Sequence, residues 1–436
     1  MRSRLEAYFE FERFNTNWRT EIVAGLTTFV TMAYIIFVNP SILHDAGMPY
    51  TAVMAATCAV AALGSILMGA VARYPIALAP GMGLNAYFAY TLVKGMGISW
   101  QAALGAVLLS GIAFLLLTAV GIRRMIVNAI PTELYAAVAA GIGLFIALIG
   151  FRNAGIIVPN PATMVGLGNL RAPQTLLAIF GLLLISALLA WGVRAAMLAG
   201  ILVTTAIGAV AGLIPWNPTP YSWTDLTATL LELDVKGALN LGAIEIVFVF
   251  LFVDLFDNVG TLVGVGKKAG LFNEANRIPR IDRILFVDAT STVASALAGT
   301  STVVSYIESA AGVVAGGRTG VPAIVAGLCF LAAVFAAPLA GVIPAAATAP
   351  ALIIVGCLMA SHVAEIAWDK PLNAIPAFLT ILGIPLTFSI ANGLALGFTS
   401  FTLLKLLRGE FRDVGWLMYA LTALFLFRFA YLSGGG

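Results

Sequence analysis

Two aspartates lie three residues apart in the stretch VDLFDNVGTLVG, residues 253–264. Asp254 and Asp257 follow a strongly apolar run, so both lie at the depth of a bilayer if this segment crosses a membrane. A third deep carboxylate, Glu308, occurs in TSTVVSYIESAAG, residues 300–312. A charge at mid-membrane costs roughly 2.5–3.5 kcal/mol on insertion scales. Carboxylates kept at that cost predict a function, such as binding a polar solute or carrying a proton.

The spacing of the two aspartates places both on one face of a helix. Like charges this close in a low dielectric cannot both ionise easily, so we expect the pair to share a proton near neutral pH. Asp254, Asp257 and Glu308 are therefore the predicted proton-coupling groups. A purely structural role, in which a protonated acid bonds a neighbouring span, stays open for each, and it is favoured for Asp288 and Glu245.

The composition identifies the class of protein that must position these acids. The chain has 436 residues, of which 61% are hydrophobic and 10% charged, whereas a soluble domain carries about 25% charged residues. This predicts a polytopic membrane protein. Only two histidines and three cysteines occur, and the cysteines form no paired motif. We therefore expect no enzyme activity, no metal site, no cofactor and no nucleic-acid partner.

Fourteen apolar stretches are long enough to cross a bilayer. They lie near 21–41, 51–71, 76–98, 101–121, 131–151, 174–191, 193–214, 239–266, 281–298, 301–316, 320–341, 344–364, 372–389 and 390–408. With this count, most of the 23 lysines and arginines fall on one side, which the positive-inside rule makes the cytoplasm. The predicted location is the cell inner (plasma) membrane, with a cytoplasmic N-terminus. Whether residues 414–432 cross the membrane or lie at its interface stays open.

A faint internal repeat supports a transporter architecture. IPTELYAAVAAGIGLFIALIG, residues 130–150, is similar to IPAAATAPALIIVGCLMASHV, residues 343–363. Seven spans precede the loop at 215–238 and seven follow it. An odd number of spans per half inverts the second half relative to the first, so we predict a 7+7 inverted repeat within an all-α fold.

Two of the fourteen spans cannot be regular helices. The third contains YPIALAPGMGLNAYFAY, residues 74–90, in which Pro80 and Gly81 interrupt a helix. The tenth, residues 299–317, opens with a polar and β-branched run before Glu308. We predict an extended piece followed by a half-helix in each. Unwound backbone at membrane depth is tolerated only around a cavity or inside protein, so these two spans predict the solute site.

Four motifs in order resemble the xanthine/uracil permease superfamily, also called nucleobase–ascorbate transporters, in its adenine/guanine/hypoxanthine branch. The motifs are GLTTFVTMAYIIFVNP (25–40), APGMGLNAYFAY (79–90), VDLFDNVGTLVGV (253–265) and TSTVVSYIESAAGVVAGGRTG (300–320). The resemblance implies fourteen spans in two inverted halves, with short antiparallel strands in spans 3 and 10. It also implies a homodimer formed through the gate domain.

The implied domains follow from this span order. They are a cytoplasmic amphipathic segment at 1–20, core domain at 21–121 and 239–341, gate domain at 122–214 and 342–408, and a C-terminal segment at 409–436 that is an extra or interfacial helix.

The resemblance also assigns roles to single residues. Asp257 and Glu308 occupy the two positions at which the uracil and xanthine branch holds the base with carboxylates. Thr261 stands where the uracil branch has a histidine, which moves the proton chemistry onto the acids. Asn85 matches the purine branch in span 3, and Ser309 follows the second carboxylate. These five residues are the predicted substrate-binding set.

The sequence therefore predicts a secondary transporter that imports a purine nucleobase by proton symport, with the core domain moving against the gate domain. Carboxylates accept hydrogen bonds from the N–H edge of a purine, and amide and backbone N–H groups serve its acceptors. The alternatives are an anion transporter of the same fold and a passive channel. Sodium as the coupling ion is not excluded, and adenine, guanine, hypoxanthine and xanthine are not distinguished.

Overall fold

The computed structural model describes residues 2–121, 131–214, 222–240, 243–271, 278–336 and 342–431. The chain forms two compact units, which are described separately. Unit 1 comprises Met1–Leu116 and Ile149–Ile353, and unit 2 comprises Leu117–Leu148 and Ile354–Gly436. The side chain of Glu245 lies outside the described residues. The predicted division into core and gate domains stays a prediction.

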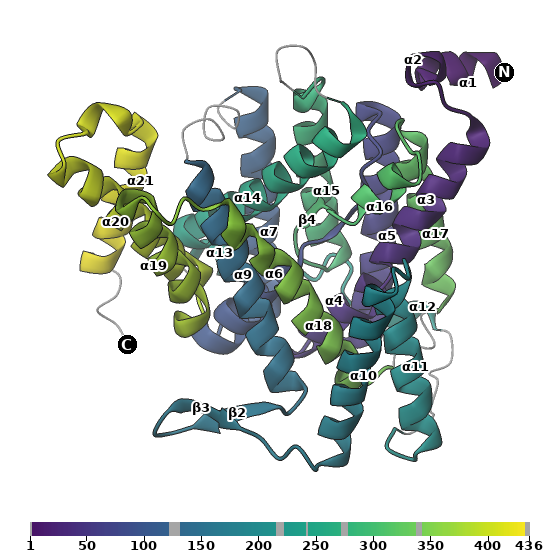
Figure 1. Cartoon of the computed structure of the whole chain (residues 1–436), viewed down its shortest axis with the longest axis horizontal. Helices are drawn as coiled ribbons and strands as arrows, with labels where there is room; N and C mark the ends of the chain where they lie inside the picture. Colours follow the sequence, from purple (N-terminus) through teal and green to yellow (C-terminus); the bar gives the residue numbers. More distant parts are fainter. Residues whose placement is uncertain are drawn as a thin grey trace. The chain divides into compact units, whose positions relative to one another are not determined.

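The described residues are mostly helical (Figure 1). The helices are α1 (Arg2–Tyr8), α2 (Phe11–Phe14), α3 (Trp18–Met32), α4 (Ile35–His44), α5 (Tyr50–Leu67), η1 (Met68–Ala72), α6 (Met82–Ala86), η2 (Tyr87–Gly95), α7 (Trp100–Ala119), α9 (Thr132–Asn153), α10 (Pro173–Ala190), α11 (Ala196–Val210), α12 (Trp223–Leu226), α13 (Val235–Asn240), α14 (Ala243–Ala269), α15 (Ile281–Ala298), α16 (Ser309–Val314), α17 (Val321–Ala333), α18 (Ala345–Ala360), η4 (Ser361–Glu365), α19 (Pro371–Thr387), α20 (Ile390–Leu407), η5 (Phe411–Asp413) and α21 (Trp416–Tyr431). The strands are β1 (Leu78–Pro80), β2 (Ile157–Asn160), β3 (Met164–Leu167) and β4 (Val303–Ser305).

Seven helical segments among the described residues are long and apolar enough to cross a membrane. They are Trp18–His44, Tyr50–Ala72, Trp100–Ala119, Thr132–Asn153, Pro173–Ala190, Ala345–Glu365 and Ile390–Leu407. Shorter apolar helices, such as α11 and α19, add to them. The class of a multi-pass helical membrane protein is confirmed, whereas the count of fourteen spans and their inverted symmetry stay predictions.

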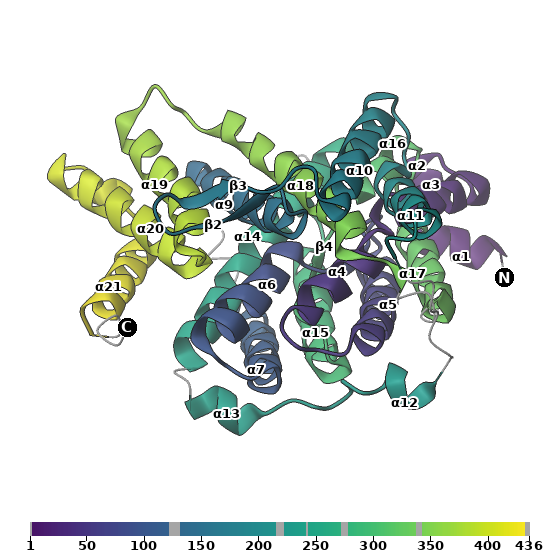
Figure 2. The ribbon, with the colours of Figure 1, turned by 90° about the horizontal axis from the view of Figure 1, so that it is seen from below.

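Helices in unit 1 approach closely through small residues. α17 packs against both α3 and α5 (Figure 1 and Figure 2). A methyl group added at Gly25 would lie 2.6 Å from the Cβ atom of Val325, and one added at Gly69 would lie 2.2 Å from the carbonyl oxygen of Gly320. Small residues at such contacts let helix backbones meet, which is how helices associate in lipid.

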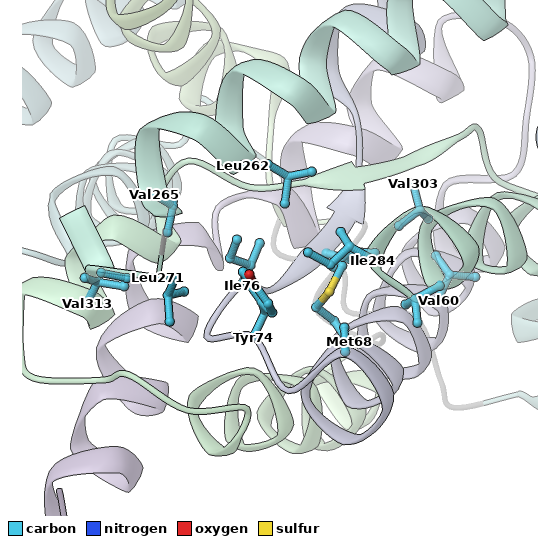
Figure 3. Packing of buried hydrophobic residues seen from close by; sticks show 14 residues of the cluster. Val60, Met68, Tyr74, Ile76, Leu262, Val265, Leu271, Ile284, Val303 and Val313 are labelled. Atoms are coloured by element: carbon cyan, nitrogen blue, oxygen red, sulfur yellow. The ribbon is translucent and has the colours of Figure 1, made fainter. Parts of the chain in front are cut away.

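An apolar cluster packs around the first strand and the residues leading into it (Figure 3). Tyr74, Ile76 and Leu78 lie in it together with Val303 of β4, all at most 3% exposed. The remaining members come from α5, η1, α14, α15 and α16, together with Leu271, two residues after α14. They are Val60, Met68, Ala72, Leu262, Val265, Ala269, Leu271, Ile284, Val287 and Val313. This packing holds the non-helical segments of both broken spans against α14 and α15.

The N-terminal segment is not one amphipathic helix. Glu10 adopts a left-handed conformation between α1 and α2, and its carboxylate pairs with Arg13 (2.7 Å), Arg73 (3.3 Å) and Arg280. Burial by itself raises the pKa of Glu10, but the hydrogen bond from Arg13 and the three arginine charges hold that pKa below its ordinary value. The first apolar helix begins earlier than predicted, at Trp18.

The hairpin of β2 and β3 was not predicted from the sequence. It connects α9 to α10 and pairs Ile157 with Leu167 through Asn160 with Met164 (Figure 1). No strict alternation marks this Pro- and Gly-containing stretch, because both faces of the hairpin are largely exposed.

In unit 2, the consecutive helices α19 and α20 pack against each other. Gly397 lies against Thr380, where an added methyl would meet the hydroxyl oxygen at 1.9 Å. The last helix, α21, packs on α20 through a 2.8 Å hydrogen bond between Thr422 and Thr402 and an edge contact between Phe398 and Phe425. Residues 416–431 of this stretch therefore form a helix; whether this helix crosses the membrane stays open.

Candidate functional site

The two interrupted spans meet as a pair of short antiparallel strands in unit 1. β1 pairs with β4 in the register Leu78 with Ser305 and Pro80 with Val303. The backbone N–H of Gly81 donates to the carbonyl of Thr302 at 2.9 Å and extends the pairing by one bond. Helix α6 follows β1 directly and α16 follows β4 closely. The predicted extended pieces and half-helices are confirmed.

Side chains also fix the strands in place. The Ser309 hydroxyl oxygen accepts a 3.0 Å hydrogen bond from the backbone N–H of Ala77. The Tyr306 hydroxyl donates to the carbonyl oxygen of Pro80 at 2.6 Å. Ser309, predicted to bind substrate, therefore also holds the end of β1, which leaves its hydroxyl hydrogen for any further contact.

The structure brings Asp257 and Glu308 to this strand pair. One carboxylate oxygen of Asp257 lies 3.6 Å from the position that a Cβ atom at Gly81 would occupy. Glu308 immediately precedes α16, and its carboxyl lies within electrostatic range of Asp257. Both residues are partly exposed. Asp254, one turn earlier on α14, is fully buried.

Asn85 and Thr261 are buried on the two elements that flank the strands. Asn85 of α6 accepts a hydrogen bond from the Ser301 hydroxyl. Among the described residues its side-chain N–H₂ group has no hydrogen-bond partner, and neither has the Thr302 hydroxyl. A buried donor without a partner costs about 1–3 kcal/mol, so a bound solute or water that accepts from Asn85 would recover that energy. Thr261 lies one turn after Asp257 and is 6% exposed.

Two residues of the site were missed in the sequence. Tyr34 donates a 2.5 Å hydrogen bond to a carboxylate oxygen of Glu308. Asn258, next to Asp257, accepts from the Ser305 backbone N–H at 2.8 Å and donates to Asp288 at 2.7 Å. Both residues stand inside the quoted motifs, as polar groups in apolar runs, and that is the signal that could have identified them.

Asn258 ties three elements together at the site. Its amide group also donates to the Asp254 carbonyl within α14, at 3.1 Å. The side chain therefore links α14 to β4 and to α15, and it is 1% exposed. This explains the burial of Asp288, whose structural role the sequence favoured, as an acceptor in a satisfied network.

We predict that Asn258→Ala lowers the free energy of unfolding by about 2 kcal/mol or more, because the buried Ser305 N–H and the Asp288 carboxyl both lose a partner. Chemical unfolding of the purified protein in detergent measures this. Asn153→Ala is the control, since the hydrogen bond of the Asn153 side chain among the described residues is a long one, 3.4 Å to the Tyr90 hydroxyl. Equal losses in the free energy of unfolding of the two variants would show that the Asn258 network stabilises the fold no more than the Asn153 contact does.

The chain matches the model of the xanthine/uracil permeases, described as the Permease family, over residues 19–396. This protein belongs to that family. It is 44% identical to the adenine permease AdeP of Escherichia coli over 98% of this chain and 96% of that one. It is 45% identical to the guanine/hypoxanthine permease PbuG of Bacillus subtilis, over 98% of this chain and all of the relative.

Solved structures extend the likeness to the fold. The transmembrane domain of the cyanobacterial bicarbonate transporter BicA superposes with a TM-score of 0.67, at 17% identity, over 87% of this chain and 96% of that one. At that identity the likeness concerns the fold alone. Membership of a permease family makes the chain a transporter and not an enzyme, as predicted, and a multi-pass membrane protein.

Proposed function

We propose that this permease imports a purine nucleobase together with a proton. The observation that carries the proposal is the position of Asp257 next to Gly81 at the paired strands and within electrostatic range of Glu308, with the buried amide of Asn85 on the helix that follows β1. A purine offers N–H donors on one edge and ring-nitrogen or carbonyl acceptors on another. Two carboxylates and an amide N–H₂ group complement these edges. The relatives AdeP, an adenine permease, and PbuG, a guanine/hypoxanthine permease, agree with that chemistry.

In this proposal the same acids bind the transported proton. Asp254, Asp257 and Glu308 are the coupling groups, and binding of one proton lets the loaded site cross the low-dielectric interior at a lower electrostatic cost. The fourteen spans form a 7+7 inverted repeat, and the core domain moves against the gate domain to give alternating access. The protein works as a homodimer in the cell inner membrane.

Uptake into cells that lack their own purine permeases tests the proposal. Labelled adenine, guanine, hypoxanthine and xanthine are offered singly and in competition with unlabelled bases. We expect uphill accumulation that a proton uncoupler abolishes and that replacement of external sodium leaves unchanged. Accumulation that depends on sodium would reject the proton, and equilibration without accumulation would favour a passive channel.

An anion transporter of the same fold is the second candidate, because BicA shares the architecture. The charged side chains that the structure brings to the strand pair are acidic, which opposes binding of an anion. Bicarbonate or sulfate uptake in the same cells, with purine uptake absent, would favour this alternative.

The proposed orientation predicts the accessibility of two exposed positions. In a background with Cys58, Cys329 and Cys357 replaced by alanine, a cysteine at Asp282 should react with an impermeant thiol reagent only after the cells are opened. A cysteine at Ala162, in the turn between β2 and β3, should react in intact cells. This follows because the positive-inside rule places the start of α15 in the cytoplasm and the hairpin outside. The opposite pattern would invert the topology.

A further inference from the structure

Tyr34 lies at an interruption in the first long apolar segment. The helix Trp18–His44 divides into α3, which ends at Met32, and α4, which begins at Ile35. Around the interruption the backbone hydrogen bonds include the tighter i→i−3 type, in which the Phe37 N–H donates to the Tyr34 carbonyl at 3.1 Å. The Thr31 hydroxyl donates back to the carbonyl of Thr28 at 2.8 Å, and such back-bonding bends helices. The sequence predicted an unbroken span here.

The half-helix α16, which begins directly after Glu308, packs against α3. A methyl group at Gly312 of α16 would lie 2.1 Å from the Thr28 hydroxyl oxygen and 2.7 Å from the Ala24 carbonyl. Only a residue without a side chain fits that approach. In Figure 1 α16 is drawn beside α3, and the two helices pack against each other.

A second contact holds the residues that follow α16 against the same helix, α3. Glu21 of α3 is fully buried. Its carboxylate accepts from the Thr319 N–H (3.2 Å) and hydroxyl (2.7 Å) and from the Arg318 N–H (3.2 Å). The segment from Glu308 to Thr319 is thus held against α3 at both ends, so the Tyr34–Glu308 contact is set by packing and not by side-chain freedom.

The contact has the geometry of a hydrogen bond that is charge-assisted when Glu308 is ionised. The 2.5 Å separation between the Tyr34 hydroxyl and the Glu308 carboxylate oxygen falls at the short end of the range of roughly 2.5–2.7 Å for O–H···O⁻ bonds. Tyr34 is 1% exposed, whereas Glu308 is partly exposed. The tyrosine therefore occupies the protein side of the carboxylate, and the solute side keeps acceptor capacity, because a carboxylate offers about four lone-pair sites.

We infer that Tyr34 is a positioning residue of the substrate site. Its hydroxyl holds the Glu308 carboxylate in the orientation that accepts the N–H edge of a purine, so that the carboxylate does not have to be ordered when the base binds. The inference rests on the proposed function. It concerns a residue that acts through Glu308 and does not itself contact the base.

Tyr34→Phe keeps the ring and removes the hydroxyl. We expect the dissociation constant for the best purine to rise about tenfold, the low end of what a hydrogen bond to a charged group contributes, with maximal uptake at saturation largely kept. Tyr90→Phe is the matched control: Tyr90 is also buried, and its hydroxyl donates to the Asp45 carboxylate at 2.6 Å, away from the strands. The purine affinity of Tyr90→Phe should stay within about twofold of that of the unmodified protein.

A double variant separates positioning from direct contact. If Tyr34 acts through Glu308, then Tyr34→Phe should weaken binding by less than about twofold further in a Glu308→Ala background, where no side-chain oxygen is left to accept from the Tyr34 hydroxyl. A full tenfold loss in that background would overturn the inference, because Tyr34 would then act on the base or on the fold independently of Glu308.

Infrared difference spectra between the unmodified protein and each variant, recorded without substrate, supply a second readout. The Glu308 band is the carboxyl band missing in Glu308→Gln, and it should shift in Tyr34→Phe but not in Tyr90→Phe. An unchanged band would refute the hydrogen bond. If the unmodified protein binds no purine, the proposed function fails and the purine part of the inference with it, while the band still decides whether Tyr34 orients Glu308.

Discussion

Asp257→Asn should abolish purine binding and uptake together. Asp257 lies beside Gly81 at the strand pair, and an asparagine there keeps the shape but loses the charge and one of the acceptor oxygens. A lost hydrogen bond to a charged group costs about 1.5–3 kcal/mol, or about 10- to 150-fold in affinity. The amide N–H₂ would in addition face an N–H of the base, which is a repulsive contact. Equilibrium binding of a labelled purine to the purified protein measures the first loss, and cell uptake the second.

Asp254→Asn is the control for this experiment, because it removes the neighbouring carboxylate on the same helix. Asp254 is fully buried, whereas Asp257 is partly exposed. We expect Asp254→Asn to keep measurable purine binding but to lose accumulation driven by a pH gradient. The reverse outcome, in which Asp254→Asn loses binding and Asp257→Asn keeps it, would exchange the two roles.

Glu308→Gln should weaken purine binding by about 1.5–3 kcal/mol, because it replaces a charge-assisted hydrogen bond to the N–H edge by a neutral one at best. The Tyr34 hydroxyl can still donate to the glutamine carbonyl oxygen, so folding should be retained. Competition binding against a labelled purine gives the affinity, and the yield of monodisperse protein in detergent reports folding.

The matched control is Glu133→Gln in unit 2. Glu133 also accepts a hydrogen bond from a neighbouring helix, from the Asn373 amide at 2.8 Å, but it has no part in the proposed site. Purine affinity should be unchanged there. Unmodified affinity in Glu308→Gln would exclude the contact with the base and leave Glu308 as a partner of Tyr34 alone.

The helical membrane class and the two interrupted spans could be predicted from the sequence because their causes are local. Apolar runs of bilayer length allow a span wherever they occur, and Pro80 with Gly81 stops a helix whatever surrounds it. The same holds for the run of β-branched residues before Glu308. The structure accordingly has β1 and β4 where extended chain was expected.

The partners of the acids could not be predicted in this way. Tyr34 and Glu308 are separated by 274 positions, and Asn258 and Ser305 by 47. Nothing in the local pattern of MAYII or DNVG specifies which distant group each side chain meets. The hairpin of β2 and β3 was missed for a related reason, since its exposed faces need no apolar alternation.

The sequence by itself determined that carboxylates lie in apolar runs and that two spans must be interrupted, one at Pro80 and Gly81 and the other just before Glu308, because hydropathy and proline act through neighbouring residues. The tertiary structure alone decided that β1 meets β4, that Asp257 lies near Gly81, that Tyr34 contacts Glu308 and that Asn258 contacts Ser305. These contacts depend on helices that approach through glycines such as Gly312. Close packing of distant segments is a property of the whole fold and leaves no periodic trace in the chain.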